Sequence, residues 1–154
     1  MTLAATTVDV TRDWFWEGNI ADAVAGFLLA GGWSIQSKAD TRTKERGIDV
    51  HASKGPVALY VEAKGWPSKT YRDPRRAGQS KPTNPTNQAA HWYAQAMLKA
   101  LRLQTAHPDA VIAIALPDVP RYRRLFEETR GGLAKLGVAL LFVSEGGRVD
   151  PVGL

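Results

Sequence analysis

The chain has 154 residues, no cysteine and a formal net charge of +5. Its length suits one globular domain with a core of its own, so we expect a single domain over residues 1–154. The lack of cysteine excludes disulfides and thiolate-bound zinc, and it fits a reducing cytoplasm. No apolar run in the sequence reaches the length of a membrane span, so no membrane partner is expected. The positive charge favours an anionic partner such as nucleic acid, although solubility would explain it equally well.

Apolar residues at helical spacing predict a first helix over residues 14–30, which a Gly-Gly pair ends. Strands are expected at residues 33–38, 47–52 and 57–64. The second and third strands are joined by a short polar link at residues 53–56, which is typical of a hairpin. We place the reversal of the chain at Lys54-Gly55.

Residues 66–85 contain four prolines and no periodic pattern, so a long loop is expected there. Thr86 is predicted to cap a second helix that continues to about residue 105. The polar stripe of this helix is predicted to carry Gln88, His91, Gln95 and Arg102, and its core face Ala94, Met97, Leu98 and Leu101.

Continuous apolar runs at residues 110–116 and 138–143 predict two strands that are covered on both faces. Between them, Asp118 is predicted to cap a third helix that ends at Gly131-Gly132. A hairpin followed by alternating helices and strands favours an α/β fold, with a mixed sheet between two layers of helices.

Three charges stand inside two short apolar strands, namely Asp49, Glu62 and Lys64. Burying an unpaired charge is costly, so charges in apolar strands need partners. Side chains alternate between the two faces of a strand, so Glu62 and Lys64 share a side, about 7 Å apart along the backbone. With the hairpin turn given above, Asp49 is expected opposite Tyr60 and diagonal to Glu62, close enough for both carboxylates to bind one ion.

Hard oxygen ligands favour Mg²⁺, with Mn²⁺ as a substitute, and the predicted ligands are Asp49, Glu62 and the carbonyl of Ala63. Such an ion activates water and neutralises charge that develops on a phosphate. Lys64 can orient that water or stabilise the transition state. A solvated sheet edge with ordinary surface ion pairs would also account for the three charges.

Residues 47–50 (GIDV) and 61–64 (VEAK), in this order of helices and strands, resemble the active-site motif of the PD-(D/E)xK nuclease superfamily. The likeness is greatest to its restriction endonuclease-like and Holliday junction resolvase-like members. It implies a restriction endonuclease-like, three-layer α/β/α fold with a central mixed sheet. It also implies a Mg²⁺-dependent endonuclease that hydrolyses phosphodiester bonds in DNA, with RNA left open. Ile48 stands where many members have proline, a position at which the family varies.

An acid on the first helix is a further expected ligand. Glu17 falls on the stripe of Ile20, Val24 and Leu28, and the resemblance implies that a glutamate of this helix joins the metal site. An acid in a first helical turn is also favoured by the helix dipole, which is an equal alternative. Asp22 points to the opposite face and is the weaker candidate.

The resemblance further implies that a polar residue of the second helix faces the site. Gln88 is the predicted residue, with Gln95 as an alternative, and either would orient water or phosphate. A solvent-facing polar stripe explains both glutamines equally well. His51 is interpreted as a neighbour of the site rather than as a metal ligand, and His91 as part of the polar stripe rather than as a catalytic base.

The predicted loop at residues 66–85 carries five cations against one acid and follows the third strand directly. Its basic residues are Lys69, Arg72, Arg75, Arg76 and Lys81. A basic segment beside the metal suits a phosphate backbone, and Trp66 and Tyr71 could stack on unpaired bases. A solvated loop would explain this charge but not its position.

Two further features bear on partners. Arg121, Arg123 and Arg124 begin the third helix, where cations oppose the dipole, so a phosphate or a nearby glutamate should offset that cost. Trp14 and Trp16 are expected in the core or at a homodimer contact. The leading hypothesis is a metal-dependent nuclease. The alternative is a non-catalytic nucleic-acid-binding or assembly module on the same fold.

Overall fold

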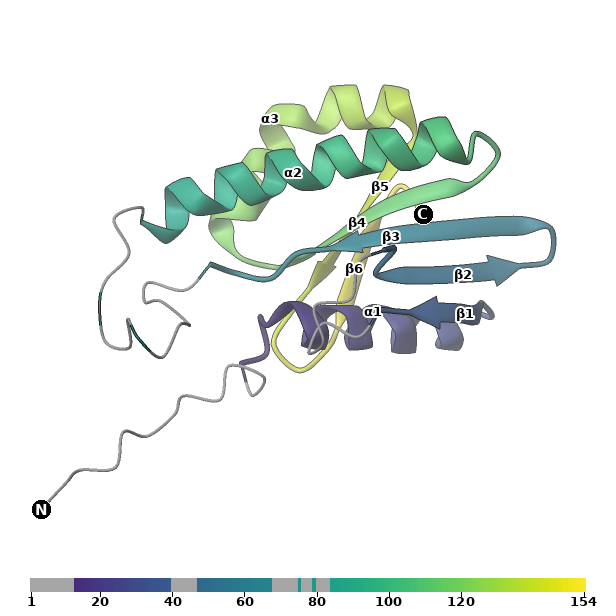
Figure 1. Ribbon diagram of the computed structural model, residues 1–154, viewed down its shortest axis with the longest axis horizontal. Coiled ribbons are helices and arrows are strands. Elements are labelled where there is room, and N and C mark those ends of the chain that lie inside the picture. Colours follow the sequence, from purple (N-terminus) through teal and green to yellow (C-terminus); the bar gives the residue numbers. More distant parts are fainter. Residues whose placement is uncertain (1–12, 40–46, 68–74, 76–78, 80–83) are drawn as a thin grey trace, which may run out of the picture.

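The computed structural model describes residues 13–39, 47–67, 75, 79 and 84–154 (Figure 1). In chain order the elements are α1 (Glu17–Ala30), β1 (Ser34–Lys38), β2 (Val50–Lys54), β3 (Val57–Ala63), α2 (Pro85–Ala106), β4 (Val111–Pro117), α3 (Pro120–Leu136), β5 (Val138–Val143) and β6 (Val149–Val152).

The strands form one mixed sheet in the order β1-β2-β3-β4-β5-β6. Pairing is antiparallel from β1 to β3, parallel from β3 to β5, and antiparallel again between β5 and β6. Helix α1 covers one face of this sheet, whereas α2 and α3 lie together on the other (Figure 1). The predicted three-layer α/β/α architecture with a central mixed sheet is therefore confirmed.

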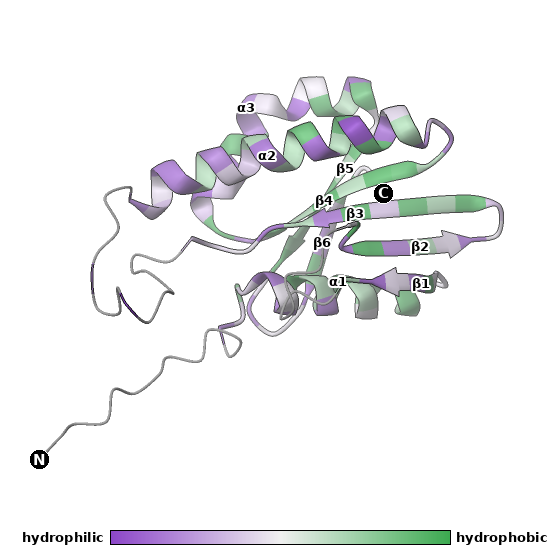
Figure 2. Ribbon diagram, in the orientation of Figure 1, coloured by the Kyte–Doolittle hydropathy of each residue, from purple (hydrophilic) through white to green (hydrophobic). Residues whose placement is uncertain are grey.

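Each face of the sheet has its own apolar core. On one face Ile20, Val24 and Leu28 of α1 are fully buried against small and branched residues of β2 to β5. On the other, Tyr122 and Phe126 of α3 pack with α2 on β4 and β5. Strand β4 lies between both cores, which explains its uninterrupted hydrophobic sequence (Figure 2).

Helix ends differ from those predicted because other residues supply the terminal contacts. The side chain of Asn84, not Thr86, caps α2 by accepting a hydrogen bond from the Asn87 N–H. Helix α3 runs past its internal glycine pair to Leu136, and Gly137 at φ +70° ends it. Asp118 does not cap α3, since Val119 occupies that position.

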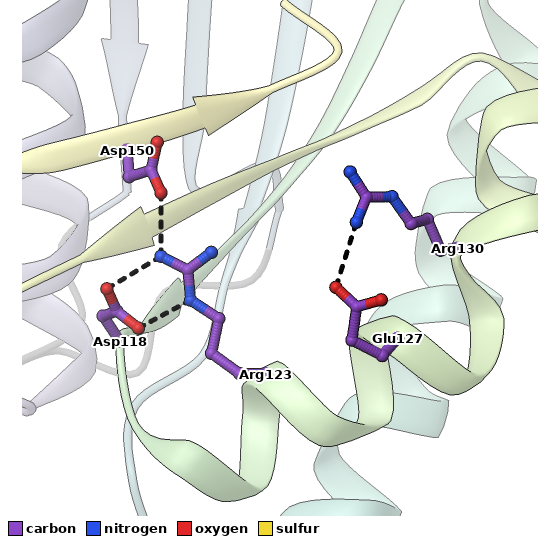
Figure 3. Close-up of polar contacts among 5 residues, drawn as sticks. All are labelled: Asp118, Arg123, Glu127, Arg130 and Asp150. Atoms are coloured by element: carbon purple, nitrogen blue, oxygen red, sulfur yellow. Dashed lines mark hydrogen bonds and ion pairs between the residues drawn. The ribbon is translucent and has the colours of Figure 1, made fainter.

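Strand β6 was not predicted, and an arginine of α3 fastens it to the sheet. The Arg123 guanidinium donates two hydrogen bonds to Asp118, at 2.7 and 2.8 Å, and one of 2.8 Å to Asp150 of β6 (Figure 3). It also lies 3.9 Å from the centroid of the Phe142 ring. These hydrogen bonds hold the pKa of Asp118 below its usual value. Arg123 thus joins α3, the end of β4 and the edge strand.

We expect Arg123→Met to lower the free energy of unfolding by about 1–2 kcal/mol at neutral pH, because it removes a bidentate pair that solvent partly screens. Urea denaturation would measure this loss. Since the folded-state pKa of Asp118 is lowered, the stabilisation is present above the ordinary carboxyl pKa and disappears as the pH falls below it. The control is Arg130→Met, which breaks an exposed pair with Glu127 (Figure 3) and a 5.3 Å contact with the Phe126 ring, both on the same helix. Equal losses in both variants would contradict this role of Arg123.

Candidate active site

The charged end of β3 meets the starts of α1 and α3. Glu62 pairs in register with Ile114 of β4, whose side chain belongs to the core beneath α2 and α3, so Glu62 faces that layer. The N–H of Lys64 donates to the carbonyl of Ala115, which carries the β3–β4 pairing one residue beyond the strand. The acid and the lysine are therefore fixed on rigid backbone.

Asp49 lies just before β2, and its carboxylate is bonded to the end of β3. Its Oδ2 accepts a hydrogen bond of 2.8 Å from the N–H of Ala63. The predicted register was wrong, because His51 rather than Asp49 lies opposite Tyr60. The turn is Gly55-Pro56, with Gly55 at φ +58°, and this brings Asp49 level with Glu62 instead of diagonal to it.

The strand that Asp49 precedes is shorter than expected. Strand β2 begins at Val50 rather than at Gly47, which has φ +142° and so a backbone shape that favours glycine. Ile48 consequently packs with the core under α2 and α3, whereas Val50 faces α1. Ile48 and Val50 therefore lie on opposite faces of the sheet, although residues two apart in the strand predicted at residues 47–52 would share one.

Asp49 and Glu62 are the two charged residues among the buried polar groups of the described chain, at 8% and 3% exposure. The pKa of Asp49 is raised to about 7, mainly by burial and next by the negative charge of the neighbouring Glu62 carboxylate. The Ala63 N–H opposes this shift, and the charge of Glu17 adds to it least. The two carboxyl groups are therefore close enough to repel one another strongly.

Two lysines neutralise Glu62. Lys64 Nζ lies 3.2 Å from Oε1, and Lys99 Nζ of α2 lies 2.8 Å from Oε2. Lys99 also donates to the carbonyl of Gly47, which ties α2 to the segment that carries Asp49. Sequence reasoning missed Lys99, because a single lysine on a long polar helix carries no local signal.

The core face of α2 was predicted correctly at Met97, which packs against the core, and wrongly at Ala94, Leu98 and Leu101. Leu98 and Leu101, placed in the core from the sequence, are 49% and 39% exposed. The residues that face the sheet are instead mostly small, namely Ala89, Tyr93, Ala96, Ala100 and Leu103. Alanines let the helix pack closely on the sheet. With this face buried, Lys99 lies where its ammonium group reaches Glu62.

Of the two acids considered on α1, Glu17 is the one near the site. It is half-buried in the first turn, and its charge raises the pKa of both Asp49 and Tyr122. Asp22 is exposed and pairs with Lys38 of β1. The sequence-based preference for Glu17 over Asp22 therefore agrees with its place in the structure, while its role as a ligand stays a prediction.

Gly65 allows α1 to approach the end of β3. A Cβ at this position would lie 2.5 Å from the Phe15 carbonyl oxygen and 2.9 Å from the Glu17 nitrogen. On its other side, the buried hydroxyl of Tyr122 donates a 2.9 Å hydrogen bond to the Gly65 carbonyl. The N–H of Trp66 donates a hydrogen bond to the Phe15 carbonyl, which also joins this segment to the residues before α1. This glycine thus sets the distance between Glu17 and the acids on the sheet.

The remaining predicted site residues are placed less centrally or are not described. Gln88 is half-buried, and its Oε1 has no hydrogen-bond partner among the described residues. Gln95 and His91 are exposed, and the His51 ring stacks on Tyr60 with 4.4 Å between centroids. Arg75 is exposed. The predicted phosphate contacts Lys69, Arg72, Arg76 and Lys81, and the stacking residue Tyr71, lie outside the described residues.

Two of the predicted metal ligands, Asp49 and Glu62, lie together in the structure. Within the ranges that the structure describes, no group of three histidine, cysteine, aspartate or glutamate residues gathers closely enough to hold an ion. Mg²⁺ needs only one or two protein carboxylates, because waters complete its coordination. Asp49 and Glu62 supply these two, and Glu62 Oε2 is buried without a well-oriented hydrogen bond despite its contact with Lys99. The carbonyl of Ala63 and the carboxylate of Glu17 stay predicted ligands.

No family model matches the chain, and neither does any curated protein. Two solved structures are similar to it over most of their length. One is an fdxN element excision controlling factor protein from Anabaena variabilis, at 17% identity and a TM-score of 0.50, covering 90% of this chain and 97% of that one. The other is an XisH family protein from Nostoc punctiforme PCC 73102, at 16% identity and a TM-score of 0.50, covering 85% of this chain and 95% of that one.

At these identities the likeness shows a shared fold. Both neighbours belong to the restriction endonuclease-like fold class, so the predicted fold class is confirmed. Among the helices of the described chain, none is long and apolar enough to cross a membrane.

The carboxyl pair predicts an unusual pH dependence in the absence of divalent ions. Because the folded-state pKa of Asp49 is raised to about 7, the folded protein binds a proton that the unfolded chain releases near pH 4. Stability should therefore fall as the pH rises between these values. Asp49→Asn removes this loss, and we expect it to be more stable than wild type by about 2–4 kcal/mol above pH 7, in urea denaturation with EDTA. The control is Asp22→Asn, and an Asp49→Asn profile parallel to that of wild type would contradict the assignment.

The close approach at Gly65 gives a second prediction. We expect Gly65→Ala to lower the free energy of unfolding by about 1–3 kcal/mol, because its methyl group would collide with backbone atoms that cannot turn aside. Thermal and urea unfolding would measure the loss. Gly131→Ala is the matched control, since a Cβ there meets nothing within 4 Å and Ala favours a helix interior. Unchanged stability in Gly65→Ala would show that α1 can shift without cost.

Proposed function

We propose that this protein is a Mg²⁺-dependent nuclease of the PD-(D/E)xK superfamily that hydrolyses phosphodiester bonds in DNA. The observation that carries the proposal is the burial of Asp49 beside Glu62 on rigid strand ends, with Lys64 3.2 Å from Glu62. Buried carboxylates that repel one another are costly in a purely structural role. A divalent cation would offset that cost.

The residues have distinct roles in this proposal. A bound Mg²⁺ would lower the pKa of a water and neutralise charge on the phosphate. Asp49 and Glu62 would hold the ion, with Glu17 reached through water. Lys64 is held by Glu62 and stays partly exposed, so its ammonium group can orient the attacking water or stabilise the charged transition state.

The surface near this end of the sheet supports a nucleic-acid substrate. Of the three arginines at the start of α3, Arg123 is neutralised by Asp118 and Asp150. Arg121 instead donates to the Thr86 carbonyl, and Arg124 is exposed. Within the described residues neither has a carboxylate partner, so both charges are available to phosphates although they oppose the helix dipole. RNA binding and a homodimer that cuts both strands of a duplex stay predictions.

The alternative is a non-catalytic nucleic-acid-binding or assembly module. It is favoured by the two ammonium groups on Glu62, since they neutralise this acid without any metal. It is also compatible with the similar protein from Anabaena variabilis, whose name describes control of excision. Asp49 argues for the nuclease, because no lysine or arginine of the described chain forms an ion pair with it.

The decisive experiment is a cleavage assay with Mg²⁺ or Mn²⁺ on linear, nicked, flapped and four-way-junction DNA. We expect cleavage that EDTA abolishes and that Lys64→Ala slows by about 10²–10³-fold, because the transition state loses its cation. Asp49→Asn and Glu62→Gln should remove activity.

The control variant is Lys135→Ala, an exposed lysine near the end of α3, which should keep wild-type activity. Cleavage that survives in the Lys64, Asp49 and Glu62 variants would come from a contaminant and would refute the nuclease. Salt-sensitive DNA binding without cleavage under either metal would support the binding module.

A further inference from the structure

Lys99 enters the site from a different layer than the acids. Its neighbours Ala96 and Ala100 are fully buried in the core between α2 and the sheet, and α2 contacts β3. The Lys99 side chain is 34% exposed, and its Nζ lies 2.8 Å from Glu62 Oε2. The same ammonium group donates to the Gly47 carbonyl.

The two lysines take different oxygens of Glu62. Lys64 lies on Oε1 and stands one residue beyond β3, where its N–H is bonded to the Ala115 carbonyl. Lys99 lies on Oε2, which is buried and has no well-oriented hydrogen bond from any described residue. The oxygen that is otherwise available to a cation is therefore covered by the more exposed of these two lysines, Lys99 at 34% against 19% for Lys64.

The contact with Gly47 gives Lys99 a second partner that does not depend on Glu62. Gly47 lies two residues before Asp49, and Asp49 is itself bonded to the Ala63 N–H. Lys99 can give up Glu62 and keep the Gly47 carbonyl, so the segment that carries Asp49 stays fastened while the carboxylate is released.

We infer that Lys99 is a positioning residue that competes with a divalent cation for Glu62 Oε2 and so weakens cation binding at this site. The inference rests on the proposed function. An ammonium group and a divalent ion on this one oxygen would carry like charges at short range and so repel each other. Lys99 holds Glu62 neutral until the cation binds, and then moves away from it.

The test is the affinity of the whole chain for Mn²⁺ without nucleic acid, measured by calorimetry and by the loss of the free Mn²⁺ electron paramagnetic resonance signal. We expect Lys99→Met to bind Mn²⁺ at least about tenfold more tightly than wild type, because one competing charge is removed. Lys99→Arg keeps the charge and should stay near the wild-type affinity. Arg102→Met removes an exposed charge from the same helix and should change affinity by less than about twofold.

The outcomes separate this inference from the function on which it rests. Equal or weaker Mn²⁺ binding by Lys99→Met, with wild type binding, would overturn the competition and leave the nuclease standing. An absence of binding in wild type and all variants would overturn both. If Lys99→Met does not fold by circular dichroism, Lys99→Gln replaces it, since its amide can still donate to Gly47 without a charge.

Discussion

Two carboxyl groups are buried against each other at the end of β3, and the structure around them offsets the cost of that burial. An unpaired carboxylate in an apolar interior is destabilising by several kcal/mol, at the order of magnitude of whole-protein stability. Asp49 accepts a hydrogen bond from the backbone N–H of Ala63. Glu62 forms ion pairs with Lys64, just beyond β3, and with Lys99 of α2. These contacts depend on the late start of β2, on the positive φ of Gly47 and on the alanines through which α2 packs on the sheet.

A second constraint joins the layers at the same place. Gly65 is held between the backbone of Phe15 and Glu17 on one side and the hydroxyl of Tyr122 on the other. Tyr122 is fully buried, and burial together with the charge of Glu17 raises the pKa of its hydroxyl, so it remains a neutral donor. Groups from all three layers are thereby held at fixed spacing around the acids. Such spacing is what a site for a small, strongly hydrated cation requires.

The sequence predicted what depends on local pattern and failed where distant contacts decide. The alternation around Glu62 and the apolar run of β4 reflect burial, which hydrophobicity reports directly. The β2–β3 register depends on which two residues make the turn, and a different choice at Gly55 moves Asp49 by two positions. The buried face of α2 could not be predicted from the sequence, because leucines and alanines occur on both its buried and its exposed side. Lys99 acts through Glu62 and Gly47, and Arg123 joins α3 to Asp150, partners that are distant in the chain, so the neighbouring sequence does not indicate these roles.

The balance of charge explains how one site can be stable in two states. Among the ion pairs of the described residues, Glu62 contacts the ammonium groups of Lys64 and Lys99, and Asp49 contacts none. Near neutral pH the raised pKa of Asp49 lets this carboxyl group keep a proton, which removes its negative charge. A divalent cation carries as much charge as that proton and one ammonium group together. Exchange of the proton and the Lys99 contact for the cation therefore keeps the net charge around the two buried acids the same in both states.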